Sequence, residues 1–389
     1  MAKLTKNKPA GPSPEQVDLM RILSLDIRTQ PDDETVEIES FLRLSQEAFS
    51  NGERLLPKQV DALLEFERMR GGFFPVGVGF GKTGISLMAS QVAFNRGWVR
   101  RVLLLVPVHL VGSLMKRHIP EWRRRTNLSL TFHVMAGQSR HARAELARSG
   151  AQGVYVMPYS LLSQPDAIEV LSAIDADMVV ADEAHRLKNP RSGGTKRLLH
   201  FLHSREEAGR KPIFVAMSGS FTQKSIMDYH HLIDAALGDG SPLPCRASTA
   251  YTWGLVLDSG AMPNNGLVAG AMSNLISWAH RNFPGEASLF SSRVSANNAR
   301  HAYCRRLVTA PGVVTTSDER PSASLGISNL EVPGAGPRLL ALIDRVKNDY
   351  ETPEGEPIDH SIHTYKWMLE LTSGFYNSLV WPSVADHAK

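Results

Sequence analysis

Residues 57–237 repeat one pattern, in which short apolar runs of strand length alternate with amphipathic segments of helix length. The apolar runs predict strands at Gly72–Val76, Val102–Pro107, Leu128–Met135, Gly153–Met157, Met178–Ala181 and Ile213–Ser218. The longer segments predict helices at Pro57–Arg70, Lys82–Arg96, Val108–Trp122, Gln138–Arg148, Ser192–Ser204 and Ser225–Leu237. This alternation predicts an α/β fold with a mostly parallel sheet flanked by helices.

The remainder of the chain departs from this alternation. Residues 1–16 are rich in Lys, Pro, Gly and Ser, which is typical of a disordered tail. Residues 238–300 carry many Gly, Ser, Asn and Pro, with apolar helical pieces around Gly266–Phe283. Further on, the pattern predicts strands at Val308–Thr316 and Leu325–Val332 and helices at Arg338–Tyr350 and His363–Leu379. We therefore expect an irregular C-terminal extension after the α/β domain.

Composition narrows the class of protein. The 389 residues suffice for two domains, and 42% hydrophobic with 21% charged residues is ordinary for a globular chain. No apolar run approaches the roughly 20 residues of a membrane span, and the basic N-terminus lacks the apolar segment of a secretory signal. Cys245 and Cys304 have no metal-ligand spacing. We expect a cytoplasmic protein with reduced cysteines, neither secreted nor embedded in a membrane.

Residues 76–83 read Val-Gly-Val-Gly-Phe-Gly-Lys-Thr, between a predicted strand and a predicted helix. Gly77, Gly79 and Gly81 allow main-chain N–H groups to turn inward and cradle phosphates. Lys82 can reach the β- and γ-phosphates, and the Thr83 hydroxyl can ligate Mg²⁺. Taken alone, such a loop can also be a plain turn between strand and helix.

Residues 182–185 read Asp-Glu-Ala-His and follow the apolar run Met178–Ala181. Asp182 can hold a metal ion through a water, and Glu183 can orient and deprotonate the water that attacks a phosphate. An isolated Asp-Glu pair is more often a helix cap or a solvated turn. Because the glycine-rich loop and the acidic pair occur in this order, each after a short apolar strand, we predict binding and hydrolysis of ATP with Mg²⁺.

Both segments are similar to motifs of superfamily-two helicases. The loop resembles their Walker A form A-x-x-G-x-G-K-S/T, with Val76 at the first position, and Asp182–Asn189 resembles the Walker B segment, or DEAH box, of the Swi2/Snf2 group. Other helicase motifs follow in the expected order. Leu55–Gln59 resembles the glutamine motif, and Leu104–Pro107 resembles motif Ia. Tyr159–Leu162 resembles motif Ib, and Met217–Gln223 resembles motif III. They imply that residues 17–237 form lobe 1 of a helicase, a RecA-like P-loop domain that binds ATP.

The resemblance also implies roles for individual residues. Gln59 would hydrogen-bond the adenine edge, and Ser218 would contribute a hydroxyl to nucleotide binding. His185 can bridge towards Ser218 or Gln223 and so link the nucleotide to the nucleic-acid face, although it can also be a histidine satisfied within a turn. Phe221 replaces the usual proline of motif III, which affects the expected loop conformation. The catalytic residues predicted on these grounds are Lys82, Glu183 and His185.

Weaker resemblances follow downstream. Arg305–Leu307 and Pro311–Val314 look like the connector between two RecA-like lobes, and Lys366–Leu371 resembles the first helix of the second lobe. No Gln-x-x-Gly-Arg-x-x-Arg motif occurs, so we expect the second lobe from a missing C-terminal part or from another chain. Truncation is favoured, because the last helix would otherwise leave its apolar face unburied. We assign 238–335 to an accessory region and connector, and 336–389 to the start of a truncated second lobe.

These features predict an ATP-dependent DNA translocase or helicase of the Snf2-like type, with double-stranded DNA as the expected partner. The net charge of +4 is compatible with this, and the basic clusters Lys116–His118, Arg123–Arg125 and Arg186–Arg191 can contact phosphates or be solvated helix faces. Two alternatives are a DNA-packaging-type ATPase, which would need a nuclease domain with clustered acidic residues, and a nucleotide-dependent DNA-binding module without efficient turnover. The divergent motif III and the unusual region 238–300 point to a phage-encoded protein, which would act in the cytoplasm of a bacterial host.

Overall fold

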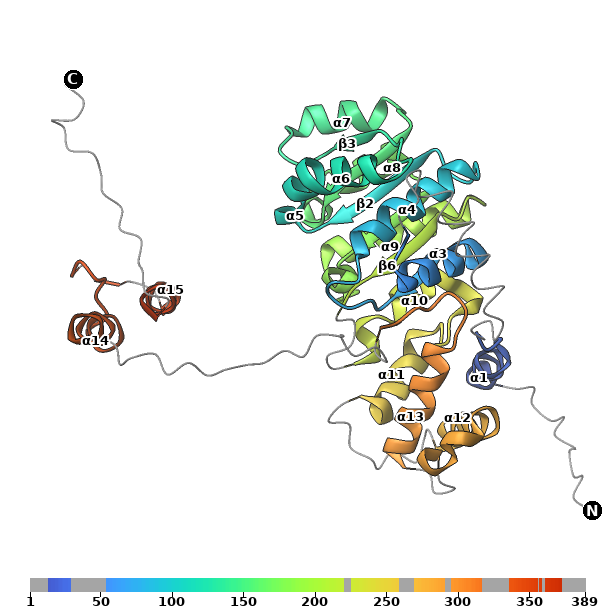
Figure 1. Cartoon of the computed structure of the whole chain (residues 1–389). Coiled ribbons are helices and arrows are strands. Elements are labelled where there is room, and N and C mark those ends of the chain that lie inside the picture. Colours follow the sequence, from blue (N-terminus) through green and yellow to red (C-terminus); the bar gives the residue numbers. More distant parts are fainter. Residues whose placement is uncertain are drawn as a thin grey trace, which may run out of the picture. The chain divides into compact units, whose positions relative to one another are not determined.

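Six strands form one sheet in the order β1-β6-β5-β2-β4-β3 (Figure 1). Its strands are β1 (Gly72–Phe74), β2 (Arg101–Val106), β3 (Phe132–Val134), β4 (Gly153–Pro158), β5 (Met178–Asp182) and β6 (Ile213–Met217). All the strand pairs in this sheet are parallel, which confirms the α/β class and the mostly parallel sheet. The structure, a computed structural model, describes residues 13–28, 54–219, 225–258, 269–290, 295–316, 336–355, 357–358 and 361–372.

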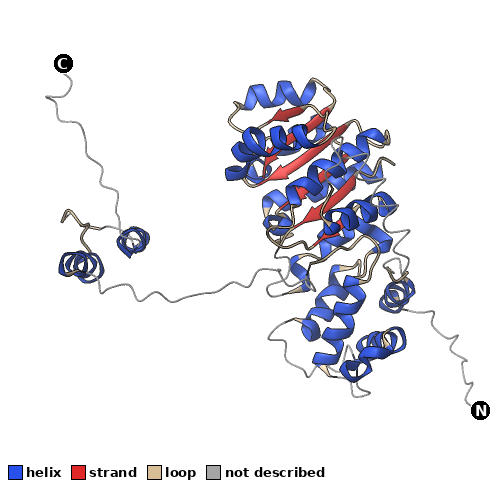
Figure 2. Ribbon diagram, viewed as in Figure 1, coloured by secondary structure: helices blue, strands red, loops and turns tan. Residues whose placement is uncertain are grey.

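Helices cover both faces of the sheet (Figure 2). One face packs against α3 (Pro57–Met69), α4 (Lys82–Asn95), α5 (Val108–Ser113), the π-helical turn η1 (Leu114–His118) and α6 (Ile119–Arg125). The other face packs against α7 (Arg140–Arg148), α8 (Ala167–Ile174), α9 (Gly193–Glu207) and α10 (His230–Leu237). All the helices predicted in this part of the sequence are present. The structure also contains α8, which the sequence pattern does not predict.

The burial of β2 explains why the strands are apolar throughout. Leu103 and Leu105 belong to the core on one face of the sheet, and Val102, Leu104 and Val106 belong to the core on the other. A parallel sheet covered on both faces requires apolar side chains at successive positions rather than at alternating ones. Continuous apolar runs in the sequence therefore mark the central strands.

The strand predicted at Val308–Thr316 is wrong. Helix α13 (Ala296–Val308) extends to the first residue of this range, and Val313 makes only an isolated bridge to Phe73. Pro311 has no main-chain N–H to donate, and Gly312 has a positive φ of 77°, so a ladder cannot run through residues 308–311, and bonds to β1 begin only at Gly312. The strand predicted at Leu325–Val332 lies outside the described residues.

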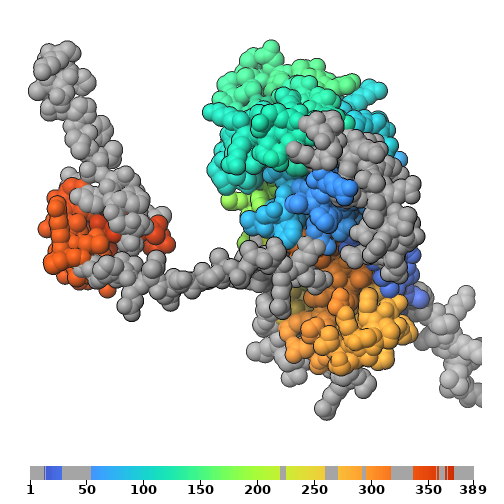
Figure 3. Space-filling view, viewed as in Figure 1, coloured from blue at the N-terminus to red at the C-terminus, as the bar shows by residue number. Residues whose placement is uncertain are grey.

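The described residues between 238 and 308 add a helical subdomain beside the sheet. It contains η5 (Gly238–Gly240), α11 (Ala247–Leu257), α12 (Ala269–Asn282), η7 (Pro284–Phe290) and α13. Of these, the sequence predicts helical structure only around α12. The N-terminal helix α1 (Pro14–Ser24) packs against α12, and Figure 3 shows the two in blue and yellow-orange on the same side of the molecule.

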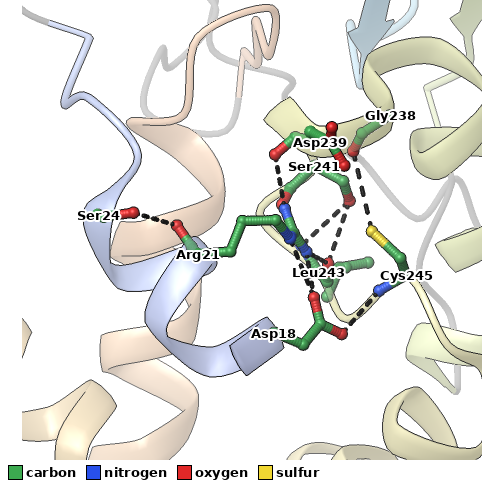
Figure 4. A network of polar contacts seen from close by, with 8 residues as sticks. All are labelled: Asp18, Arg21, Ser24, Gly238, Asp239, Ser241, Leu243 and Cys245. Atoms are coloured by element: carbon green, nitrogen blue, oxygen red, sulfur yellow. Dashed lines mark hydrogen bonds and ion pairs between the residues drawn. The ribbon is translucent and has the colours of Figure 1, made fainter. Parts of the chain in front are cut away.

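Arg21 fastens α1 to the segment that follows α10 (Figure 4). Its guanidinium donates hydrogen bonds of 2.6–2.8 Å to the main-chain carbonyls of Asp239, Ser241 and Leu243. The Asp18 carboxylate accepts from Arg21 at 2.6 Å and from the Cys245 N–H at 3.0 Å. Hydrogen bonds to charged groups contribute more than neutral ones, so this network fixes α1 on the subdomain.

Helix α1 also corrects the extent of the predicted tail. Ser13 caps the helix by accepting from the Gln16 N–H, and the Gln16 side chain accepts from the Ser13 N–H in return. Residues 14–16 of the predicted tail are therefore helical, while residues 1–12 lie outside the described residues. Within the described part of the chain, no helix has the length and apolar content that crossing a membrane requires.

Residues 321–389 form a second unit, separate from residues 1–320. Its described part contains α14 (Pro337–Asp344), the π-helical turn η8 (Arg345–Asp349) and α15 (Ser361–Thr372). Both helices are predicted by the sequence, although residues 373–379 of the second lie outside the described residues. The domain boundary expected after residue 335 borders residues 317–335, which also lie outside the described residues. This boundary therefore stays a prediction.

Candidate active site

The glycine-rich loop joins the end of β1 to the start of α4. Gly79 and Gly81 have positive φ values of 91° and 75°, a backbone conformation that residues with a side chain rarely adopt. A Cβ atom on Gly81 would also lie 2.3 Å from Gln59 Nε2, whereas nothing lies within 4 Å of one on Gly79. Gly79 is therefore needed for the path of the chain, and Gly81 for both the path and the close approach of Gln59.

Helix α4 begins at Lys82, directly after this loop. The first N–H groups of a helix have no partner within the helix, and the helix dipole adds a partial positive charge there. The loop and the N-terminus of α4 therefore form a cradle for an anion such as a phosphate group. Thr83 is the second residue of α4 and is half-buried. Its role as a metal ligand stays a prediction.

Lys82 points back into the loop and towards the end of β5. Its ammonium donates to the carbonyl oxygens of Val76 and Gly77, both at 3.3 Å. It also lies 3.4 Å from Glu183 Oε1. The structure thus brings together the lysine of the first motif and the glutamate of the second, which are separated by about a hundred residues in the sequence.

Asp182 is the last residue of β5 and is only 6% exposed. Burial, together with the charge of Glu183, raises the pKa of Asp182 to about 6, although the charge of Lys82 opposes this. Its Oδ1 atom is buried, and among the described residues it has no hydrogen-bond partner. A buried carboxylate oxygen without a donor is suited to a cation, so the residue fits the predicted role in holding Mg²⁺.

The rest of a magnesium shell would not come from acidic side chains. Within the described residues there is no group of three or more His, Cys, Asp or Glu side chains that could hold a metal. Mg²⁺ in phosphate-transferring sites is commonly held by one or two carboxylates, with the remaining ligands from water and substrate phosphates. The single orphaned oxygen of Asp182 next to a phosphate cradle agrees with that pattern.

Glu183 adopts a left-handed backbone conformation with φ 57°. For a residue other than glycine this conformation costs roughly 1–2 kcal/mol, so other contacts must hold it. The carboxylate lies 3.4 Å from Lys82 Nζ, accepts from the Ser218 hydroxyl at 3.4 Å and lies 3.2 Å from His185 Nδ1. Strain of this kind tends to occur at functional sites.

Ser218 connects these groups to the neighbouring strands. It directly follows β6, is fully buried, and its N–H donates to the Phe74 carbonyl at the end of β1 at 3.3 Å. Its hydroxyl lies 3.0 Å from His185 Nδ1. Because the same hydroxyl donates to Glu183, a consistent assignment has His185 Nδ1 carrying the proton and donating to Ser218. The contact between His185 and Ser218 is one of the two that the sequence predicts, while Gln223, Ser220 and Phe221 lie outside the described residues.

Gln59 lies at the other side of the loop, near the start of α3. Its Oε1 accepts from the Leu56 N–H at 3.0 Å, and its Nε2 donates to the Gly81 carbonyl at 3.2 Å. The amide therefore ties the N-terminus of α3 to the last residue of the loop. Within the described part of the chain, one N–H of its amide has no partner and could bond a ligand, and contact with adenine stays a prediction.

Tyr159 belongs to the segment that resembles motif Ib. The sequence predicts no separate role for it, but the structure places it beside Asp182. Its hydroxyl donates to the main-chain carbonyl of Asp182 at 2.8 Å. Burial raises the pKa of Tyr159 well above its usual value, so the hydroxyl keeps its proton. Tyr159 also lines a cavity of about 300 Å³ beside the segments that resemble motifs Ia and Ib. The other residues that line it are Pro107, Val108, His109, Ser160, Leu162, Ser163, Arg186, Leu187, Ser192, Gly194 and Thr195.

Comparisons with known proteins identify the family of this part of the chain. Residues 41–235 match the model of the SNF2-related domain family. No curated protein matches the chain in sequence. Among solved structures, the SWI2/SNF2 ATPase core of Sulfolobus solfataricus in complex with double-stranded DNA has 14% identity and a TM-score of 0.40, over 69% of this chain and 46% of that chain. The UvsW helicase from bacteriophage T4 has 16% identity and a TM-score of 0.33, over 50% of this chain and 62% of that chain. The chain therefore spans only part of the length of either structure.

Replacing Lys82 tests whether the loop binds phosphate groups. Lys82→Ala removes the charge that faces the loop and Glu183, and charged hydrogen bonds contribute roughly 1.5–3 kcal/mol. We expect the affinity for Mg-ATP to fall at least tenfold, measured by titration with a fluorescent nucleotide analogue. Lys211→Ala is the matched control, because Lys211 lies just before β6, at the amino ends of the strands and away from the loop, where it pairs with Glu206 of α9. Equal affinities for the two variants would refute the site.

Proposed function

The chain belongs to the SNF2-related domain family, and on this premise we propose that it is an ATP-dependent DNA translocase or helicase of the Snf2-like superfamily-two type. The observation that carries the proposal is the convergence of Lys82, Glu183, His185 and Ser218 in one connected set of contacts beside Asp182. These groups match the needs of phosphoryl transfer, namely phosphate binding, a metal ligand and a base for water.

Nucleotide binding uses the cradle at the start of α4. Lys82 and the N–H groups at the start of the helix hold the phosphates, and Gln59, which lies beside the loop, would contact the base. Thr83 and Asp182 would hold Mg²⁺, which when bound neutralises phosphate charge. With its pKa near 6, the Asp182 carboxyl is mostly ionised at neutral pH and can serve as a ligand.

Glu183 is the residue for the chemical step. Its carboxylate carries contacts from Lys82, His185 and Ser218, which fix its orientation at the end of β5. A carboxylate held in this way can orient and deprotonate an attacking water. His185 and Ser218 then act as positioning residues, because they hold Glu183 and connect it to β6.

Nucleic acid would bind at the cavity between motifs Ia and Ib. This cavity is lined by the hydroxyl-bearing residues Ser160, Ser163, Ser192 and Thr195 and by the exposed Arg186. Hydroxyls, arginine and main-chain N–H groups are the usual partners of phosphodiester oxygens. Tyr159 lines the cavity and donates to Asp182, so it would connect nucleic-acid binding to the metal site.

A second RecA-like lobe would complete the catalytic site. The phosphate cradle of the described residues is contacted by one cationic side chain, Lys82. In phosphoryl transfer, an added arginine finger contributes about 10³–10⁵ in rate. In the resembled helicases that arginine comes from the second lobe, and we propose the same partner here.

Exchanging Glu183 for glutamine separates an ATPase from a binding module. Glu183→Gln keeps the size of the side chain but removes the base, and general acid–base catalysis contributes roughly 10²–10⁴ in rate. We expect ATP affinity to be retained and single-turnover hydrolysis to fall by about this factor. Unchanged single-turnover hydrolysis would show that Glu183 is not the base, and a wild-type chain that stays inactive even with a second RecA-like lobe supplied would favour the binding module.

DNA binding should depend steeply on salt. If Arg186 contacts a phosphate, Arg186→Gln should weaken duplex binding and reduce the slope of log affinity against log salt by about 1. The measurement is fluorescence anisotropy of a labelled duplex at several salt concentrations. Arg210→Gln is the control, since this exposed arginine pairs with Asp175 away from the cavity and should leave the slope unchanged. Affinity that does not vary with salt would contradict contact with the phosphate backbone.

The 389-residue chain alone should turn ATP over slowly, with little stimulation by DNA. The reason is the lack of an arginine finger to stabilise the negative charge that develops on the transferred phosphoryl group, a contribution of about 10³–10⁵ in rate. Steady-state ATPase should be measured with and without duplex DNA, and again after a second RecA-like lobe is supplied. Robust DNA-stimulated turnover by the chain alone would show that an arginine within it, or within a second copy, already completes the site.

A further inference from the structure

The segment after α13 lies along the outer edge of β1. The Phe73 N–H donates to the Gly312 carbonyl at 2.9 Å, and the Val314 N–H donates to the Phe73 carbonyl at 3.3 Å. These bonds use the edge of β1 that faces away from β6. We call residues 312–316 the edge segment; it runs parallel to β1 and therefore leads towards the glycine-rich loop.

The start of the edge segment is firmly anchored. The Gly312 N–H donates at 2.6 Å to a carboxylate oxygen of Glu65, a buried residue of α3. Val313 and Val314 are fully buried. A main-chain N–H bonded to a buried carboxylate, followed by two buried side chains, fixes this part of the chain against the lobe.

The end of the edge segment contacts the glycine-rich loop itself. Thr316 Oγ1 accepts a hydrogen bond of 2.8 Å from the Gly77 N–H, and the Thr316 N–H donates to the Pro75 carbonyl at 3.4 Å. A Cβ atom on Gly77 would lie 3.1 Å from Thr316 Oγ1, so the loop and the threonine are in close contact. The carbonyl of the same Gly77 accepts from Lys82. The two contacts therefore meet at one residue, because Gly77 donates to the threonine hydroxyl and accepts from the phosphate-binding lysine.

We propose that Thr316 is a positioning residue for nucleotide binding, which holds the first turn of the phosphate loop and couples nucleotide occupancy to the order of the edge segment. This inference rests on the proposed function as an ATP-binding site. Coupling between two parts of a protein is reciprocal, so if the edge segment stabilises the loop for nucleotide, bound nucleotide stabilises the edge segment. The edge segment is the last described part of the first unit before residue 321, where the second unit begins.

Three variants test the role of the hydroxyl. Thr316→Val keeps the shape of the side chain but removes the acceptor oxygen, and Thr316→Ser restores it. Thr309→Val is the control. It removes a nearby hydroxyl that donates to the Arg305 carbonyl of α13, away from the loop. A net hydrogen bond corresponds to a roughly 2- to 10-fold change in an equilibrium constant. Fluorescent ATP analogue titrations should give an affinity lower by about this factor for Thr316→Val, and wild-type affinity for Thr316→Ser and Thr309→Val.

Hydrogen exchange provides a second measurement that a merely structural role would not change. In wild type, Mg-ATP should slow amide exchange in peptides that cover residues 312–316, and Thr316→Ser should behave in the same way. In Thr316→Val, this nucleotide-dependent protection should be lost while the protection of β2 and β5 is unchanged. The wild-type measurement stands by itself if a variant fails to fold.

The two proposals fail differently. If the wild-type chain binds nucleotide but its edge segment gains no protection, or if Thr316→Val binds with wild-type affinity and retains the protection, the role of Thr316 is refuted and the proposed function stands. If the wild-type chain binds no nucleotide at all, both are refuted. A loss of affinity shared equally by Thr316→Val and Thr309→Val would assign the effect to general destabilisation and also refute the inference.

Discussion

The candidate site depends on one buried positive charge, the ammonium of Lys82. With 9% of its side chain exposed, this lysine has lost most of its water and needs protein oxygens around it. The loop carbonyls and the Glu183 carboxylate supply them. In return, the lysine lowers the pKa of Asp182 against the opposing effects of burial and of Glu183. The charge of Lys82 therefore allows the carboxylates of Asp182 and Glu183 to lie next to each other at the end of the buried strand β5. Without this lysine, Asp182 would be protonated in a larger fraction of molecules at neutral pH.

The parallel register of the sheet places these groups at one level. Phe74 of β1 pairs with Met217 of β6, and Met217 pairs with Asp182 of β5, so the three strands end side by side. The residue after each strand end then enters the site or the loop that leads to it. Ser218 and Glu183 are neighbours for this reason, although 35 positions separate them in the sequence. The carboxyl ends of the strands in an open α/β sheet are the usual place for ligands, and here the register also determines which side chains meet.

Much of this could be predicted from the sequence, because its causes are local. Central strands are continuous apolar runs, and the loop glycines and the acidic pair follow directly from such runs. What the sequence could not predict depends on distant contacts. The left-handed conformation of Glu183 is held by groups on other strands, and the raised pKa of Asp182 comes mainly from burial. The apolar stretch after α13 resembles a strand, yet Pro311 and Gly312 interrupt the ladder. The bond between Thr316 and Gly77 joins residues 239 positions apart and belongs to no motif.

The same distant contacts give the helical subdomain a physical connection to the site. The N-terminal stretch that contains α1 reaches the end of α13 through two bonds, from the Arg28 N–H to the Thr309 carbonyl at 2.6 Å and from the buried Arg306 to the Asp26 carbonyl at 2.9 Å. The chain then passes the Glu65 anchor and reaches the loop at Thr316. These contacts form one continuous path of hydrogen bonds from the stretch after α1 through the end of α13 to the loop. The phosphate loop is therefore held in part by a segment from outside the consecutive strands and helices of the lobe, and that segment is itself bonded along β1.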